Sequence, residues 1–158
     1  MPKGTVDFFK AIGVARADGT QFGTQFATQF DEYYLCLLVG LDARRLGQVS
    51  DLVSTGEFIK DYPTSFQAQS TVIAGLLVDA ELDRQLIGAV DRDAIQQEML
   101  RLLDHNSATG LSSVGQGLLN QYAAGGFSII RDQLPSPQSL PDLLRAYVHI
   151  WHPPDAAS

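Results

Sequence analysis

Apolar residues dominate the segment Phe30–Leu41, FDEYYLCLLVGL, and its last nine residues carry no charge. A helix with so little polar surface has to lie in the middle of a domain, with other helices packed around it. The basic pair Arg44 and Arg45 favours the negative end of a helix, and Gly47 favours its stop. The pattern therefore predicts a buried central helix from about residue 29 to residue 46.

Individual positions refine this prediction. Thr28, with Asp31 three positions later, has the spacing of a capping box and predicts where the central helix begins. Gly40 lies inside the predicted helix, where glycine costs about 1 kcal/mol relative to alanine. This cost indicates that a neighbouring helix approaches closely there. The single cysteine, Cys36, lies in the same apolar run and is predicted to be a small core residue.

Helical spacing of apolar residues recurs downstream. Asp91 opens an amphipathic segment whose apolar face is predicted to be buried and contains Ile95, Met99, Leu102 and Leu103. A further helix is predicted from Ser113, whose spacing to Gln116 fits a capping box, and Gly125-Gly126 is predicted to end it. Period-two alternation is confined to very short stretches, so no sheet is required.

These elements predict an all-α fold, a compact bundle of six or seven helices around the central helix. A chain of 158 residues can bury about 70% of the surface that it exposes when unfolded, which is enough for one domain. No linker rich in Pro, Gly and Ser divides the sequence. We therefore expect a single domain over residues 1–152 and a short C-terminal tail over residues 153–158.

Composition narrows the function classes. With 18 acidic and 11 basic residues the net charge is −7, which disfavours general phosphate binding and suits a basic partner. One cysteine permits neither an internal disulfide nor a multi-cysteine zinc site, so a cytoplasmic location is expected. The N-terminus lacks a signal-peptide pattern, and the central apolar run is too short to span a bilayer. No membrane association is expected.

Candidate catalytic residues are few. Asp79, Glu81 and Asp83 could suggest acid–base chemistry or a divalent cation, but their spacing favours solvated helix ends. His149 and His152 could place two metal ligands on one helix face, yet no third ligand is evident nearby. Phosphate-loop and GxSxG patterns are absent from the sequence. We therefore expect a protein that is not an enzyme, with no catalytic residues, no cofactor and no metal.

Partner contacts are expected from two features. Thr-Gln-Phe occurs three times ahead of the central helix and spaces Phe22, Phe26 and Phe30 by four residues. These rings either pack in the core or present an interface, and their spacing fits both. Arg44 and Arg45 form either a charge pair at a helix C-terminus or a small basic patch. The candidate contact residues are therefore Phe22, Phe26, Arg44 and Arg45.

The segments FATQFDEYYLCLLVGLDARR and LLNQYAAGGFSIIRDQLP, the second followed by an acidic and apolar helix, resemble small helical proteins of bacterial DNA phosphorothioation (Dnd-type) defence loci. The resemblance covers Phe26–Arg45 and roughly Leu118–Tyr147, and neither part contains a catalytic motif. It implies an accessory subunit of a multi-protein DNA modification or restriction system. It assigns no functional residue to this chain.

The leading hypothesis is a non-catalytic helical domain that binds another protein, as an accessory component of a bacterial DNA modification or restriction complex. The alternative is a nucleic-acid-binding module that uses Arg44, Arg45 and the nearby aromatics, so that DNA is contacted directly rather than through a complex. An enzyme that uses His149 or His152 with a carboxylate is the third hypothesis. A homodimer also fits, because exposed apolar helix faces often pair.

Overall fold

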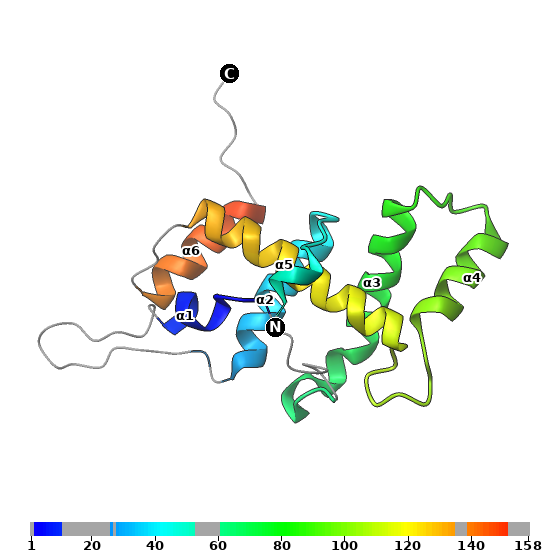
Figure 1. Cartoon of the computed structure of the whole chain (residues 1–158), viewed down its shortest axis with the longest axis horizontal. Coiled ribbons are helices and arrows are strands. Elements are labelled where there is room, and N and C mark those ends of the chain that lie inside the picture. Colours follow the sequence, from blue (N-terminus) through cyan, green and yellow to red (C-terminus); the bar gives the residue numbers. More distant parts are fainter. Residues whose placement is uncertain (1, 11–25, 27, 53–60, 135–138, 152–158) are drawn as a thin grey trace, which may run out of the picture.

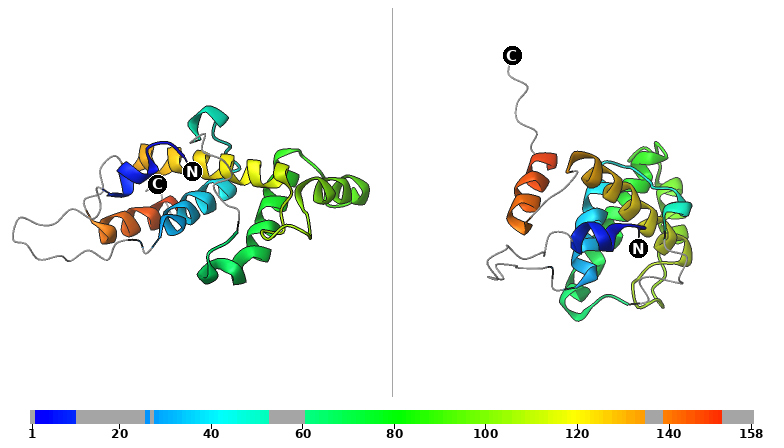
Figure 2. Two further views of the ribbon diagram at one scale, coloured as in Figure 1. Left: turned by 60° about the horizontal axis from the view of Figure 1, so that its bottom comes forward. Right: turned by 60° about the vertical axis from the view of Figure 1, so that its left-hand side comes forward.

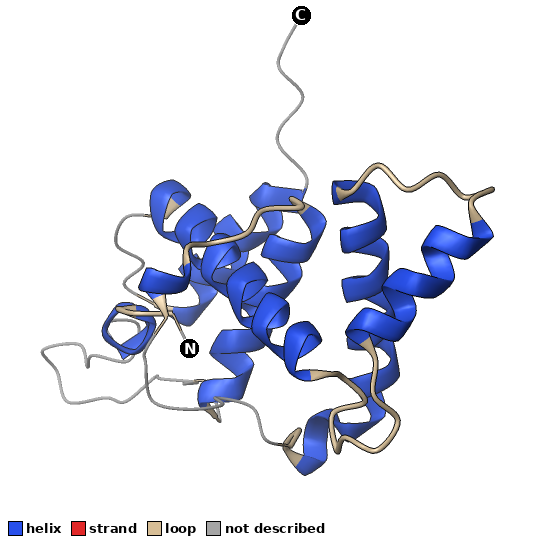
Figure 3. Ribbon diagram, turned by 45° about the vertical axis from the view of Figure 1, so that its right-hand side comes forward, coloured by secondary structure: helices blue, strands red, loops and turns tan. Residues whose placement is uncertain are grey.

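The computed structural model describes residues 2–10, 26, 28–52, 61–134 and 139–151. In these ranges the regular structure is helical and no strand is present (Figure 3). The all-α prediction is therefore confirmed. The described elements are α1 (Thr5–Lys10), α2 (Gln29–Asp42), the 3₁₀ helices η2 (Val49–Asp51) and η3 (Thr64–Gln69), α3 (Ser70–Arg84), α4 (Arg92–Leu102), α5 (Ser113–Gln133) and α6 (Leu140–Trp151).

The core lies mainly between α2 and α5, which pack together along much of their length (Figures 1 and 2). Tyr33, Cys36 and Leu37 of α2 are fully buried, and so are Tyr122 and Ala123 of α5. The fully buried side chains of α3 extend this core on one side. The prediction of a buried central helix is therefore confirmed.

Glycines let α2 and α5 approach to backbone distance. A Cβ at Gly40 would overlap the carbonyl oxygen of Tyr122, and a Cβ at Gly126 would overlap the carbonyl oxygen of Cys36. No side chain larger than a hydrogen atom fits at either position. The predicted close approach at Gly40 is therefore confirmed.

The prediction that Gly125-Gly126 ends a helix is wrong. α5 continues without a break to Gln133, and both glycines are buried in its interior. Gly125 lies against the backbone of Arg45, where a Cβ would overlap the carbonyl oxygen. The two glycines are therefore needed for packing against the preceding chain, and they do not act as a stop signal.

The central helix begins where the sequence predicts. The amide N of Asp31 donates to Thr28 Oγ1 (3.3 Å), and the amide N of Thr28 donates to Asp31 Oδ2 (2.6 Å). This reciprocal pair is the capping box expected from the spacing of the two residues. Asp91 likewise caps α4 by accepting a hydrogen bond from the amide of Ala94 (3.1 Å).

Two predicted helix boundaries need correction. α2 ends at Asp42 rather than near residue 46, because Arg44 has a left-handed φ of 51°. The amide of Arg44 donates to Leu41 O (3.2 Å) and that of Arg45 donates to Gly40 O (3.0 Å). These bonds form a Schellman motif with arginine in the position that glycine usually takes. α5 is capped by Ser112 rather than Ser113, through a bond from the amide of Gly115 (3.1 Å).

The bundle is elongated, with α4 at one end of its long axis and α1 and α6 towards the other (Figures 1 and 2). No helix in the described ranges is long and apolar enough to cross a lipid bilayer. The predicted boundary between the domain and its tail, at residue 152, lies outside the described residues.

Candidate functional site

Helix α4 buries a carboxylate next to one leucine and leaves two other apolar side chains exposed to solvent. Glu98 and Leu102 are the buried residues of this helix. Met99 is 42% exposed and Leu100 is 72% exposed. The predicted buried face is therefore wrong at Met99, and the inward position is taken instead by a carboxylate. The reason lies in the contacts that Glu98 makes.

Those contacts belong to a group of polar side chains that we call the Glu81 cluster: Glu81, Arg84, Gln85, Glu98, Arg101 and Tyr122. Arg84 binds the Glu81 carboxylate with two hydrogen bonds of 2.8 Å, from Nε and Nη2. Tyr122 OH donates to the same carboxylate at 2.8 Å, and Arg101 Nη2 donates at 3.1 Å. Glu81 thus receives hydrogen bonds from α3, α4 and α5.

Glu98 forms the second half of the cluster. Arg101 Nε donates to Glu98 Oε2 (2.8 Å), and Gln85 Nε2 donates to Glu98 Oε1 (2.7 Å). Arg101 bridges the two carboxylates, because its Nη2 contacts both Glu81 and Glu98. The inner face of α4 is therefore held to α3 by directed polar contacts rather than by a broad apolar surface.

The cluster keeps both carboxylates ionised. Burial by itself raises the pKa of the Glu81 carboxyl, but the hydrogen bonds from Arg84 and Tyr122 outweigh burial, so this pKa lies below its ordinary value of 4.5. Hydrogen bonds from Arg101 likewise lower the pKa of Glu98. Glu81 is completely buried, so the prediction of solvated helix ends is wrong at this position. Asp79 and Asp83, in contrast, are exposed.

The C-terminal end of α4 is fixed to the start of α5. The amide of Ser112 donates to Leu102 O (2.9 Å), and the amide of Asp104 donates to Gly110 O (3.0 Å) across the intervening turn. Gly115 lies so close to Leu102 that a Cβ there would overlap its carbonyl oxygen. Together with the Glu81 cluster, these contacts hold α4 in one orientation and leave its outer face unpacked.

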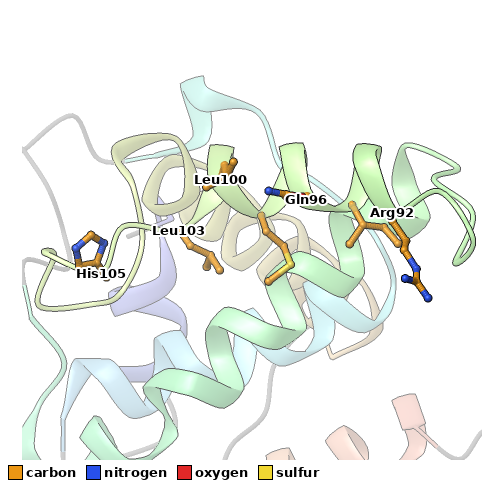
Figure 4. Close-up of a pocket in the computed structure, with 7 residues that line it drawn as sticks. Arg92, Gln96, Leu100, Leu103 and His105 are labelled. Carbon is orange, nitrogen blue, oxygen red and sulfur yellow. The ribbon is translucent and has the colours of Figure 1, made fainter.

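That outer face contains an apolar groove with a volume of about 420 Å³, which we call the α4 groove (Figure 4). Arg92 lies at one end of it and His105, on the following loop, lies at the other (Figure 4). Its lining consists of Arg92, Ile95, Gln96, Met99, Leu100, Leu103 and His105. The middle of the groove is therefore aliphatic, and its polar groups are at the ends and on one edge.

Further apolar side chains are exposed on the loop between α3 and α4. Leu86 is 91% exposed and Val90 is 94% exposed. Leu86 also has a left-handed φ of 57°, which an L side chain adopts at a cost. The end of the molecule that carries α4 therefore combines a groove with exposed aliphatic residues beside it in the sequence.

A second apolar groove, with a volume of about 390 Å³, involves α2, η3 and α6. Its lining includes Phe26, Asp31, Tyr34, Leu35, Phe66, Leu140 and Leu144. Both neighbours of Phe26 lie outside the described ranges, whereas the lining of the α4 groove falls within the continuous range 61–134. The α4 groove, with the exposed Leu86 and Val90 beside it in the sequence, is the candidate site.

The candidate contact residues lie apart from one another. Phe26 packs edge-on against Phe9, with 5.3 Å between ring centroids, and precedes the N-terminus of α2. Arg44 and Arg45 follow its C-terminus, about 20 Å away along a helix of this length. Phe22 lies outside the described residues. The structure therefore does not bring the arginines and the described aromatic residue together.

Arg44 is already paired. Its Nη2 contacts Asp79 (2.6 Å) and Asp83 (2.8 Å), and its Nη1 donates to Leu41 O (2.6 Å). The side chain of Arg45 is exposed. The charge of Arg44 is thus compensated within the protein, and it connects the end of α2 to α3.

The described residues contain no group of three His, Cys, Asp or Glu side chains placed to hold a metal ion. His149 is exposed on α6, and His152 lies outside the described ranges. Cys36 is fully buried, and burial followed by the charge of Glu32 raises the pKa of its thiol far above the usual range. Cys36 is therefore a core residue, as predicted.

The apolar spacing of α4 does not predict the α4 groove, because it assigns the whole apolar stripe to the buried face of the helix. At about 100° per residue, the apolar side chains from Ile95 to Leu103 span roughly 160° of the helix circumference. An arc of that width exceeds what one packing contact covers, and Leu100 lies at its outer edge. The sequence feature that indicates an exposed apolar surface on α4 is therefore the width of the apolar stripe, and not its periodicity.

Comparisons of this chain with protein-family models, with curated proteins and with solved structures find no match.

Proposed function

We propose that this protein is a non-catalytic binding subunit that docks another protein on the α4 groove. The observation that carries the proposal is the exposure of Met99 and Leu100 on a helix whose opposite face is fixed by the Glu81 cluster. Removing apolar surface from water is favourable by about 25 cal/mol per Å². A partner that covers Met99 and Leu100 would therefore gain binding free energy from them.

Rigidity supports the same function. A surface that is already in its bound conformation loses little conformational entropy on association, which leaves more of the contact energy for affinity. The bonds from α3 and α5 to α4 supply this pre-organisation. Methionine in the groove adds a side chain that adapts to the shape of a partner.

The setting is proposed from the sequence. Within the resemblance to Dnd-type proteins, the expected partner is another subunit of a DNA modification or restriction complex in the cytoplasm. DNA would then be contacted through the complex. Direct binding through Arg44 is less favoured, because that guanidinium already pairs with Asp79 and Asp83.

The test is affinity purification of the tagged chain from its native host in low and moderate salt. Leu100→Glu and Met99→Glu place a charge in the groove at positions that are already exposed, so the fold should tolerate them. The matched control is Val148→Glu, at a 53% exposed position of α6. Circular dichroism and thermal unfolding should be the same for all three variants.

We expect a stoichiometric protein partner with the native chain and with Val148→Glu, and its loss with either α4 variant. A partner that is retained by both α4 variants would contradict docking on this groove. Recovery of the chain alone, or with nucleic acid that dissociates in salt, would contradict the proposed function itself.

A further inference from the structure

We infer that the occupant of the α4 groove is an amphipathic helix with basic flanking residues, supplied by a different protein. This inference rests on the proposed function and adds the chemistry of the partner. It follows from the shape of the groove, from the charges around it and from the poor fit of a second copy of this chain.

The shape favours a helix. Ile95, Met99 and Leu103 follow one another at intervals of four residues and form a single row along α4 and its end. The 11 residues of α4 extend about 16 Å, close to three helical turns. A helix laid along such a row contacts it with side chains at intervals of three and four residues, the usual mode of helix recognition by apolar grooves.

The charges from the second half of α3 to the loop after α4 are predominantly acidic. Between Asp79 and Asp104 the chain has seven acidic and three basic residues, a net charge of −4. The Glu81 cluster uses two of the carboxylates and two of the arginines, so these charges cancel inside the protein. Arg44 offsets one of the two aspartates that it binds on α3. The charges left at the surface are therefore mostly negative.

Negative charges lie at both ends of α4, although no carboxylate of the described residues lines the groove itself. Asp91 and Asp93 lie at the N-terminal end of α4, and Asp104 lies just beyond its C-terminal end. Arg92 lines the groove between the two aspartates in sequence and offsets one of them, so one negative charge remains at that end, and one, from Asp104, at the other. A partner helix with Lys or Arg about three turns apart, on either side of its apolar positions, would place a cation near each acidic end.

A second copy of the chain fits less well. Pairing two α4 grooves would bring two acidic surfaces together, and like charges across an interface oppose association. Nucleic acid is disfavoured for the same reason, because the phosphate backbone would face this acidic surface. Charge complementarity thus points to a basic protein segment.

The test uses the full chain with the photoreactive residue p-benzoylphenylalanine as its probe. The probe replaces Leu100, Met99 or Leu103 in three separate variants, and Val148 in the control. After irradiation in the native host, the attached segment is identified by mass spectrometry. We expect a protein segment with helical apolar spacing and flanking Lys or Arg from all or most of the α4 positions, and not from the control.

A charge variant sharpens the test. Asp93→Lys combined with Asp104→Lys should lower the yield of the cross-link at least about fivefold, whereas Asp132→Lys, at an exposed position of α5, should leave it unchanged. Attachment to another copy of this chain, or to an acidic or uncharged segment, would overturn the inference and leave protein docking intact. Attachment to nucleic acid, or to nothing at all three positions, would overturn both.

Discussion

The backbone of Gly126 lies directly against the carbonyl oxygen of Cys36, and the relationship is reciprocal one turn away, where Gly40 lies against the carbonyl oxygen of Tyr122. Each glycine is therefore the partner of a backbone group on the opposite helix. This contact sets the separation of α2 and α5, and the rest of the bundle is arranged around that pair. Substitutions at these glycines should therefore lower the stability of the whole fold.

Gly126→Ala should destabilise the protein by about 3 kcal/mol or more, because the added methyl group meets backbone, which cannot rotate away. Gly117→Ala is the matched control in the same helix, since a Cβ there has open space around it. Alanine should raise stability at that position by about 0.5–1 kcal/mol. Chemical denaturation of both variants measures the two effects, and equal effects would refute the close helix crossing.

The left-handed conformation of Arg44 gives a second prediction. Arg44→Ala and Arg44→Gly both remove the ion pairs with Asp79 and Asp83, but only glycine adopts a φ of 51° without strain. Arg44→Gly should therefore be about 1 kcal/mol more stable than Arg44→Ala. Urea unfolding of the two variants isolates this difference. An alanine variant as stable as the glycine variant would mean that the helix does not end in this way.

Tyr122 tests the Glu81 cluster with little change in packing. Tyr122→Phe removes the hydrogen bond to the ionised Glu81 carboxylate and should cost about 1.5–3 kcal/mol. Tyr147→Phe removes a bond of 3.2 Å to the backbone carbonyl of Leu35 and should cost about 0.5–1.5 kcal/mol. If Tyr122→Phe cost no more than Tyr147→Phe, the tyrosine would not be supporting a buried charge.

The cluster also predicts how stability depends on pH. Glu81 and Glu98 have lower pKa values in the folded protein than their ordinary value of 4.5. Each therefore contributes stability that is fully present above that value and is lost as the pH falls through the pKa of the folded state. Glu81→Gln should cost about 2–3 kcal/mol near neutral pH, because Arg84 and Arg101 are partly exposed and can turn to water.

The cost of Glu81→Gln should shrink as the pH falls below the ordinary value of 4.5, since the unfolded native chain then binds a proton at Glu81 that the folded chain does not. Unfolding free energies of the native chain and the variant, measured from neutral pH to about pH 3, check this. A cost that stayed constant or grew on acidification would contradict an ionised Glu81 in the folded state.

Local signals in the sequence predicted the helical fold and several helix starts. Thr28 with Asp31, and Asp91, cap helices through residues three positions away, so neighbouring residues were sufficient. The end of α2 and the continuation of α5 through Gly125-Gly126 depend on contacts between distant segments. From the sequence alone, two adjacent glycines predict a helix end. Only the packing against Arg45 and Cys36 shows that glycine is required there inside a helix.

The candidate site was less accessible to sequence reasoning for a related reason. Glu81 lies between two aspartates that are exposed, and its burial depends on Arg101 and Tyr122, which are 20 and 41 residues away. Arg101 binds both Glu81 and Glu98, and this arrangement goes with Glu98 buried and Met99 exposed. It therefore determines which face of α4 is exposed to a partner. The spacing of apolar residues alone correctly places Leu102 inward, but it also places Met99 inward.

Amide hydrogen exchange of the chain, alone and bound to the protein that co-purifies with it, tests docking on α4 most directly. Our account predicts that exchange slows on binding in α4 and in the turn from residue 103 to residue 111, with little change in α6. Unchanged exchange in α4, with protection instead around the groove between α2 and α6, would contradict it.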